Sequence, residues 1–221
     1  MAEKTNDYSV SRNRMIREQL LPRGINDEKV LQVMAQVPRH IFVEDALQNQ
    51  AYGDYPLPIG EGQTISQPYI VALMTQALGL KGHETVLEIG TGCGYQTAVL
   101  AALCERVYSV ERFKTLAIKT RRNLDRLGCL NVVIKIDDGT AGWDKYAPYD
   151  AIIITAASPE IPPPLLEQLR DPGTMVIPVG DRFSQELVVV RKKEGQISRE
   201  TIEQVRFVGL IGQYGWRDNP L

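Results

Sequence analysis

The segment from Thr85 to Tyr95 constrains the fold of this chain of 221 residues more than any other. It consists of a short apolar run, an acid, and glycines at positions 90, 92 and 94. Glycine tolerates the backbone angles of a sharp turn, and the helix that follows such a turn points its first amide N–H groups at a ligand. The segment therefore predicts a buried strand, a tight turn and a helix arranged around a bound nucleotide-like ligand.

The glycine spacing distinguishes two classes of ligand. The dinucleotide fingerprint G-x-G-x-x-G needs its third glycine at position 95, which is tyrosine here. The pattern E-x-G-x-G-x-G, with Glu88 two residues before Gly90, resembles the first motif of S-adenosylmethionine-dependent methyltransferases. A carboxylate at this position would complement the positive charge of the sulfonium and ammonium groups. The alternative interpretation is a strand-to-helix turn that binds no ligand.

Composition excludes several function classes. A net charge of −2 gives no general attraction to nucleic acid or to an anionic membrane. The start of the chain is polar, and no apolar run approaches the roughly 18 residues of a membrane span. Three scattered cysteines and two isolated histidines predict neither a disulfide framework nor a metal site. We therefore expect a cytoplasmic monomer without nucleic-acid, membrane or metal partners.

From residue 84 onwards, apolar runs alternate with helical segments, which is typical of a parallel sheet covered on both faces. The predicted strands are 86–89, 107–110, 132–136, 151–154 and 175–179, with helices at 96–103, 113–127 and 164–169. Before them we expect helices at 12–21, 27–37 and 70–78, with Asp27 as the N-cap of the second, and a long ordered loop over 51–67. After them, strands 187–191 and 202–208, joined by the polar stretch 192–200, form an antiparallel pair.

These elements predict an α/β fold, namely a doubly wound, Rossmann-like methyltransferase sheet in a single domain over residues 1–221. Residues 1–82 would form N-terminal helices and an active-site loop, and 83–180 the cofactor-binding core. Residues 181–221 would form the antiparallel edge and a substrate-binding tail.

A doubly wound sheet binds its ligand at the carboxyl ends of its strands. Glu111 ends the second strand, 21 positions after Gly90, where an acid can accept hydrogen bonds from two ribose hydroxyls. Asp138 and Gly139 follow the third strand, where a carboxylate can bind an adenine amino group. Thr155 begins a run of small residues after the fourth strand. Each acid alone is better explained as a solvated strand end, but together, behind this glycine loop, they favour S-adenosylmethionine.

The acceptor must be inferred from the site rather than from the fold. The segment after the fourth strand is Thr-Ala-Ala-Ser, not the N-P-P-Tyr or D-P-P-Tyr of amino-directed methyltransferases. The chain has only two histidines, neither obviously placed at the loop, so a histidine general base is not expected. A carboxylate needs no base, because an α-carboxyl group titrates near a pKa of about 3.5. The sequence thus favours an acceptor that is already a nucleophile at neutral pH.

The segment 62–70, Gly-Gln-Thr-Ile-Ser-Gln-Pro-Tyr-Ile, resembles the signature loop of protein-L-isoaspartate O-methyltransferases. The similarity runs from about residue 10 to about residue 216 and includes several further segments. These are Val-Pro-Arg at 37–39, Tyr-Ser-Val-Glu-Arg at 108–112, Tyr-Asp-Ala-Ile-Ile at 149–153, Pro-Val-Gly at 178–180 and Val-Arg-Phe-Val at 205–208. Gly209, Gln213 and Asp137 depart from the family pattern, and this leaves the contacts of the tail open.

The resemblance implies methyl esterification of the α-carboxylate of L-isoaspartyl residues in damaged proteins and peptides, with S-adenosyl-L-homocysteine as product. The ester then recyclises to a succinimide, which starts repair to aspartate. Ser66 would be catalytic, and Ile65, Ser66, Val208 and Tyr214 would bind substrate. The implied cofactor residues are Gln63, Thr64, Ile65, Glu88, Gly90, Thr91, Gly92, Gly94, Glu111, Arg112, Asp138, Gly139 and Thr155.

Alternatives remain at this point. Ser66 also suits the N-cap of the helix that follows it. Rivals to the whole interpretation are a methyltransferase for a small molecule or RNA, and a cofactor-binding module that has lost catalysis. The first would lead us to expect a general base or a dominant basic surface, and the second a broken loop around Ser66. The sequence displays none of these features.

Overall fold

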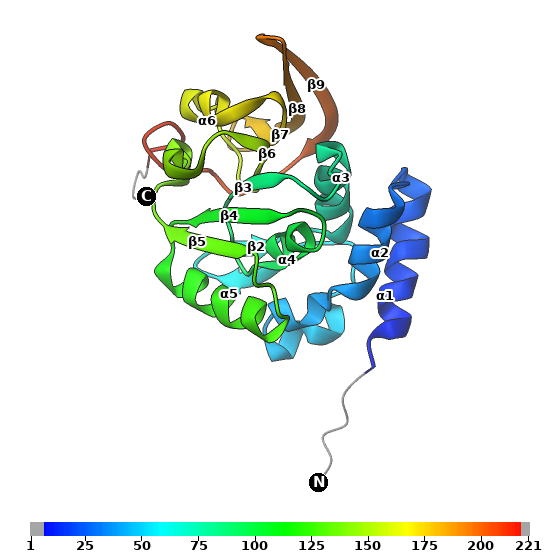
Figure 1. Cartoon of the computed structure of the whole chain (residues 1–221). Helices are drawn as coiled ribbons and strands as arrows, with labels where there is room; N and C mark the ends of the chain where they lie inside the picture. Colours follow the sequence, from blue (N-terminus) through cyan, green and yellow to red (C-terminus); the bar gives the residue numbers. More distant parts are fainter. Residues whose placement is uncertain (1–6, 218–221) are drawn as a thin grey trace.

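A seven-stranded sheet in the order β5-β4-β3-β6-β7-β8-β9 organises the structure, a computed structural model that describes residues 7–217 (Figure 1). Five strands run parallel: β3 (Thr85–Ile89), β4 (Arg106–Glu111), β5 (Val132–Ile136), β6 (Tyr149–Ile154) and β7 (Leu169–Gly180). Two strands form an antiparallel edge: β8 (Gln185–Lys193) and β9 (Gln196–Val205). The predicted doubly wound α/β fold with its antiparallel C-terminal edge is confirmed.

The central strands are apolar along their length because both faces of the sheet are covered. Ile153 packs into one hydrophobic core, while Ile152 and Ile154 pack into another on the opposite face, as the two-residue period of a strand requires. The first core contains residues of five α-helices: α1 (Ser9–Met15), α2 (Glu28–Gln36), α3 (Pro68–Leu78), α4 (Tyr95–Ala101) and α5 (Lys114–Arg126). The second is closed by α6 (Pro163–Gln168) and by aromatic side chains around η6 (Asp144–Tyr146).

The N-terminal helices lie beside α3 at one end of the sheet (Figure 1). The first predicted helix is built from α1 (Ser9–Met15), a π-helical turn η1 (Ile16–Leu20) and a short η2 (Leu21–Arg23). As expected from its sequence, α2 is capped by Asp27, whose Oδ1 accepts hydrogen bonds from the backbone N–H of Lys29 at 2.9 Å and of Val30 at 3.2 Å. Two 3-10 turns follow, η3 (Arg39–Phe42) and η4 (Asp45–Gln50).

Residues 51–67 differ from the predicted loop because they contain a small antiparallel hairpin. Its strands are β1 (Leu57–Gly60) and β2 (Gln63–Ile65). The turn between them places Gly60, Glu61 and Gly62 at φ values of 95°, 52° and 66°. Strands this short, rich in proline and glycine, carry too few residues for an alternating pattern to be recognised. The hairpin carries the signature loop across the carboxyl ends of the parallel strands.

The antiparallel edge also differs from its prediction. The polar stretch 192–200 belongs mostly to β8 and β9, and the turn itself is only Glu194 and Gly195, at φ values of 54° and 75°. Because β9 is the outer strand and is exposed along most of its length, its polar residues show no apolar alternation. The hairpin extends beyond the body of the molecule (Figure 1).

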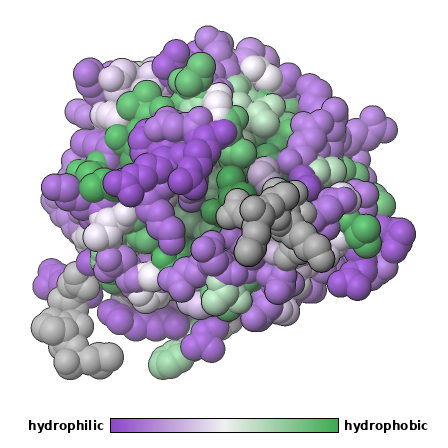
Figure 2. Space-filling view, turned by 90° about the horizontal axis from the view of Figure 1, so that it is seen from below, coloured by the Kyte–Doolittle hydropathy of each residue, from purple (hydrophilic) through white to green (hydrophobic). Residues whose placement is uncertain are grey.

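No helix within residues 7–217 is long and apolar enough to cross a membrane. Figure 2 shows that the face of the molecule seen from below is covered mainly by hydrophilic residues, with hydrophobic ones scattered among them.

Candidate active site

The glycine loop between β3 and α4 requires glycine for both conformation and space. Gly90, Gly92 and Gly94 have φ values of 94°, 56° and 91°, which other residues rarely adopt. A Cβ on Gly90 would collide with Thr155 Oγ1, and one on Gly94 would lie 2.5 Å from Thr120 Cγ2. The sequence-based interpretation of these glycines as a tight strand-to-helix turn is therefore correct.

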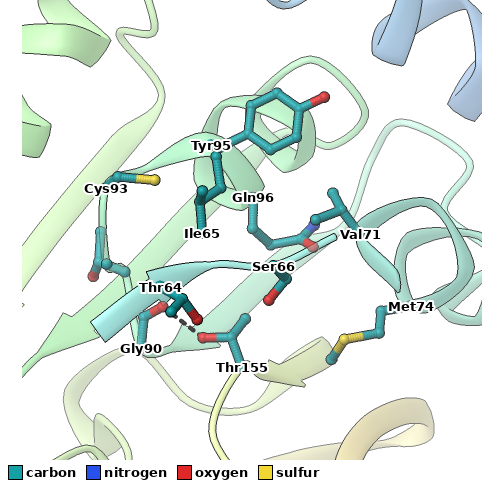
Figure 3. A pocket seen from close by; sticks show the side chains of 12 residues that line it. Thr64, Ile65, Ser66, Val71, Met74, Gly90, Cys93, Tyr95, Gln96 and Thr155 are labelled. Carbon is teal, nitrogen blue, oxygen red and sulfur yellow. Dashed lines mark hydrogen bonds between the residues drawn. The ribbon is translucent and has the colours of Figure 1, made fainter. Parts of the chain in front are cut away.

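Side chains from neighbouring strands hold the loop in place. Glu111, at the end of β4, accepts hydrogen bonds from the backbone N–H of Gly92 at 2.8 Å and of Phe113 at 2.9 Å. Thr155, which follows β6, donates its hydroxyl to the Gly90 carbonyl at 2.6 Å (Figure 3). Thr120 on α5 donates to the Gly92 carbonyl at 2.7 Å. The loop is thus fastened to three other elements before any ligand binds.

A cavity lies beside this loop, and we call it the glycine-loop cavity. The predicted residues that line it come from the carboxyl ends of four parallel strands, from the signature loop and from the tail after β9. They are Gln63, Thr64, Gly90, Gly92, Glu111, Arg112, Gly139, Thr155 and Val208.

Two further cavities adjoin it. The central pocket is lined by Ile65, Ser66 and Thr91, among others, and the outer groove by Ser66, Arg206 and Val208, among others. Thr64 and Thr155 line both of these and the glycine-loop cavity as well. Ser66 and Thr155 both line the central pocket (Figure 3). Ligands in the glycine-loop cavity and in the outer groove would therefore meet at these hydroxyl-bearing residues.

Ser66 does not cap helix α3, so that alternative is removed. The N-cap residue is Gln67, and its side chain makes no capping hydrogen bond. The carbonyl of Ser66 accepts a hydrogen bond from Arg39 Nη2 at 2.7 Å. The Ser66 side chain remains on the wall shared by the central pocket and the outer groove.

Glu88 corrects one sequence-based expectation. Its side chain is fully buried and lines none of the three cavities, so it does not offer its charge to a ligand there. Instead Oε2 accepts hydrogen bonds from Thr97 Oγ1 and Ser109 Oγ, each at 2.6 Å, and Ser109 Oγ also bonds Thr91 Oγ1 at 2.6 Å. Burial raises the pKa of Glu88 to about 7, although the two hydroxyl bonds oppose this. Glu88 is thus linked through Ser109 to Thr91 and stabilises the glycine loop.

Asp138 and Tyr214 also differ from expectation. The Asp138 carboxylate binds its own chain, accepting from the Thr140 backbone N–H at 2.8 Å and from the Gln213 backbone N–H at 2.7 Å. It therefore anchors the tail. It also lines a cavity that shares Arg112 and Ile211 with the glycine-loop cavity, so its contact with adenine stays a prediction. Tyr214 lines none of the three cavities, and its backbone N–H donates to Thr140 Oγ1 at 3.0 Å. Such bonds between residues more than 70 positions apart leave no local sequence signal.

The remaining predicted residues lie behind the cavities or in the central pocket. Thr91 and Ile65, each 3% exposed, line the central pocket, and Gly94 is the N-cap of α4. Sequence analysis gave no role to Arg23 and Arg206, which line the outer groove. Arg23 lies in no motif, and Arg206 was noted only as part of the family segment 205–208. Within residues 7–217 no cluster of three histidine, cysteine or acidic side chains is arranged to hold a metal ion.

Comparison with known proteins agrees with this geometry. A family profile described as protein-L-isoaspartate(D-aspartate) O-methyltransferase matches residues 10–215. The protein-L-isoaspartate O-methyltransferase of Geobacter metallireducens is 57% identical over 211 residues, 95% of this chain and 98% of that protein. Protein-L-isoaspartate O-methyltransferase 1 of Syntrophobacter fumaroxidans is 54% identical over 210 residues, 95% of this chain and 98% of that protein.

Solved structures give the same result. A protein-L-isoaspartate O-methyltransferase superposes with a TM-score of 0.83 at 28% identity, over 92% of this chain and 67% of that one. A putative protein-L-isoaspartate O-methyltransferase from Plasmodium falciparum, in complex with S-adenosyl-L-homocysteine, superposes with a TM-score of 0.79 at 27% identity. That match covers 90% of this chain and 98% of the other.

The buried Glu88 predicts a pH-dependent stability. Because its pKa rises from 4.5 in the unfolded chain to about 7 in the fold, the fold binds the proton more tightly. The resulting stabilisation is full below the lower pKa and is lost as pH rises through the upper one, by about 3 kcal/mol. Glu88→Gln removes this titration. In thermal unfolding, the variant should therefore gain several degrees relative to wild type between about pH 5 and about pH 8.

The matched control is Glu84→Gln. Burial raises the pKa of Glu84, but backbone N–H bonds from Gly82 and Lys81 outweigh it and lower the pKa overall. The difference in unfolding temperature between Glu84→Gln and wild type should stay constant over the same pH interval, because Glu84 is ionised throughout. If the unfolding temperature of Glu88→Gln also differed from wild type by a constant amount, the raised pKa of Glu88 would be contradicted.

Proposed function

We propose below a mechanism for this protein. The chain belongs to the protein-L-isoaspartate(D-aspartate) O-methyltransferase family. Its activity is methyl transfer from S-adenosylmethionine to isoaspartyl-containing proteins and peptides, which releases S-adenosyl-L-homocysteine and initiates their repair. The acceptor atom is an oxygen of the α-carboxylate of the L-isoaspartyl residue, whose methyl ester recyclises to a succinimide.

One observation carries the choice of acceptor: the central pocket has no group ready to take a proton at neutral pH. Its described lining includes no histidine, lysine or carboxylate. The titratable groups are Cys93, whose pKa burial raises to about 11, and Tyr95, whose pKa burial also raises. An alcohol or amine acceptor would have to lose a proton, whereas a carboxylate is already ionised. The site therefore suits a carboxylate nucleophile.

The described residues fit S-adenosylmethionine in the glycine-loop cavity. Glu111 is 5% exposed, and each carboxylate oxygen accepts one backbone hydrogen bond, which leaves lone pairs for two ribose hydroxyls. Gly90 and Gly92 keep the backbone free of side chains where the ligand must approach closely. Gly139 would lie beside the adenine, and Gln63 and Arg112 would cover the sides of the bound cofactor. When bound, the cofactor supplies a methyl group activated by a sulfonium.

The residues of the chain then have to align the partners and exclude water. The Ser66 hydroxyl donates to one carboxylate oxygen and directs the other at the methyl group. That oxygen forms the new C–O bond as the C–S bond breaks, and the electron pair of the broken bond stays on sulfur. No proton moves in this step, so the pocket needs hydroxyl groups rather than a base.

The acceptor peptide occupies the outer groove in this proposal. Val208 lines the outer groove and the glycine-loop cavity, so a peptide extended along 206–208 reaches the cofactor side. Ile65 would contact the isoaspartyl residue, whereas Tyr214 would act only through the tail that Asp138 anchors.

We further propose that the protein is a cytoplasmic monomer with a single domain, whose three parts meet at residues 82 and 180. Free thiols at Cys93, Cys104 and Cys129 support a reducing compartment.

The activity is tested with two synthetic peptides that differ only in isoaspartyl versus aspartyl at one position. With methyl-labelled S-adenosylmethionine, we expect base-labile label on the isoaspartyl peptide alone, because an ester is hydrolysed by base. Label on neither peptide, with cofactor binding established separately, would refute the proposal. Base-stable label would indicate an acceptor other than a carboxylate.

The role of Ser66 is tested by Ser66→Ala. Without the hydroxyl, the carboxylate loses its orienting donor, and kcat should fall roughly 10- to 1,000-fold, with no change in cofactor affinity. Ser66→Thr keeps the hydroxyl and is the matched control, expected to retain more activity than the alanine variant. Wild-type kcat and KM in Ser66→Ala would show that Ser66 lines the pocket but does not orient the substrate.

A further inference from the structure

Arg39 is the largest fully buried side chain of the described structure, and the mechanism above does not use it. It begins the short turn η3, far from the glycine loop in sequence. No carboxylate pairs with it within residues 7–217, and its Nη1 has no hydrogen-bond partner there. A buried, unpaired charge is costly, and such groups concentrate at functional sites.

The guanidinium joins three segments that surround the site. Nε donates to the Ala51 carbonyl at 2.6 Å, ahead of the β1–β2 hairpin, and Nη2 donates to the Ser66 carbonyl at 2.7 Å, directly after it. Its carbon lies 4.9 Å from the ring centre of Tyr95, the first residue of α4 after the glycine loop. Arg39 thus links both ends of the hairpin to the helix behind the glycine loop.

The nature of these bonds makes the link stiff. Burial lowers the pKa of Arg39, but a guanidinium stays protonated in proteins, so both hydrogen bonds are charge-assisted. The planar fork fixes two donors relative to each other, while the flat face lies over an aromatic ring. A lysine has one rotatable ammonium and cannot hold all three segments in one geometry.

We propose that Arg39 is a positioning residue that sets the distance between Ser66 and the glycine loop, and so aligns the acceptor carboxylate with the methyl donor. This inference rests on the proposed role of Ser66. A misplacement of about 1 Å costs roughly 100-fold in rate, which is why a residue outside the cavities controls turnover. The Arg39 effect must therefore pass through Ser66 and should vanish when the Ser66 hydroxyl is absent.

The test combines Arg39→Lys with Ser66→Ala in a double-mutant cycle, with kcat expressed per cofactor-binding site so that unfolded protein does not count. Arg39→Lys alone should lower kcat about 10- to 100-fold and leave cofactor affinity within about threefold. In the Ser66→Ala background the same change should lower kcat by less than about threefold. Arg39→Gln, which removes the buried charge, is a second variant should the lysine fold poorly, with the same expected pattern.

Arg121→Lys is the matched control. Arg121 also donates to two backbone carbonyls, those of Val132 at 3.0 Å and Cys129 at 3.1 Å, but it lines none of the three cavities. Its variant should lose thermal stability and keep wild-type kcat. An equal loss from Arg39→Lys in both Ser66 backgrounds, or wild-type kcat in Arg39→Lys, overturns the positioning role alone. Wild-type kcat in Ser66→Ala overturns the proposed function of Ser66 and this inference with it.

Discussion

The parallel pairing of β3 with β4 on one side and β6 on the other is the constraint on which the site depends. Parallel neighbours end at the same edge of a sheet, so residues that follow distant strands meet there. Glu111 and Thr155 reach the glycine loop for this reason and bond its backbone directly. The hairpin between η4 and α3 then carries Ser66 over this edge. The proposed reaction centre is therefore built from several segments that lie far apart in the chain.

The chemistry of the site follows from what this edge contains. Hydroxyl and amide groups line the central pocket, and its own ionisable groups, Cys93 and Tyr95, are buried and neutral at physiological pH. Such a pocket can orient an anion and exclude water, but it cannot remove a proton. Methyl transfer to a carboxylate needs no more than this. The two acidic or basic side chains of the described residues that are fully buried, Glu88 and Arg39, lie outside the three cavities and hold the loops that form them.

Sequence analysis predicted what local physics determines. The cap at Asp27, the apolar strands and the turn at Gly90 each follow from a few adjacent residues, and the signature loop identified the family. It failed where the partner of a residue lies far away in the chain. Glu88 turned out to bond Thr97 and Ser109, and Asp138 to bond the tail at Gln213. Arg39 lies in the family segment at 37–39, but its contacts could not be predicted from that segment, because its acceptors are backbone carbonyls of Ala51 and Ser66.

The most direct test of this account is a crystal structure with S-adenosyl-L-homocysteine and an isoaspartyl peptide bound together. The account predicts the ribose hydroxyls on Glu111 and the sulfur directed into the central pocket. It also predicts the isoaspartyl carboxylate between Ser66 and that sulfur, with the peptide along 206–208. A cofactor bound outside the glycine-loop cavity, or a carboxylate remote from Ser66, would contradict it.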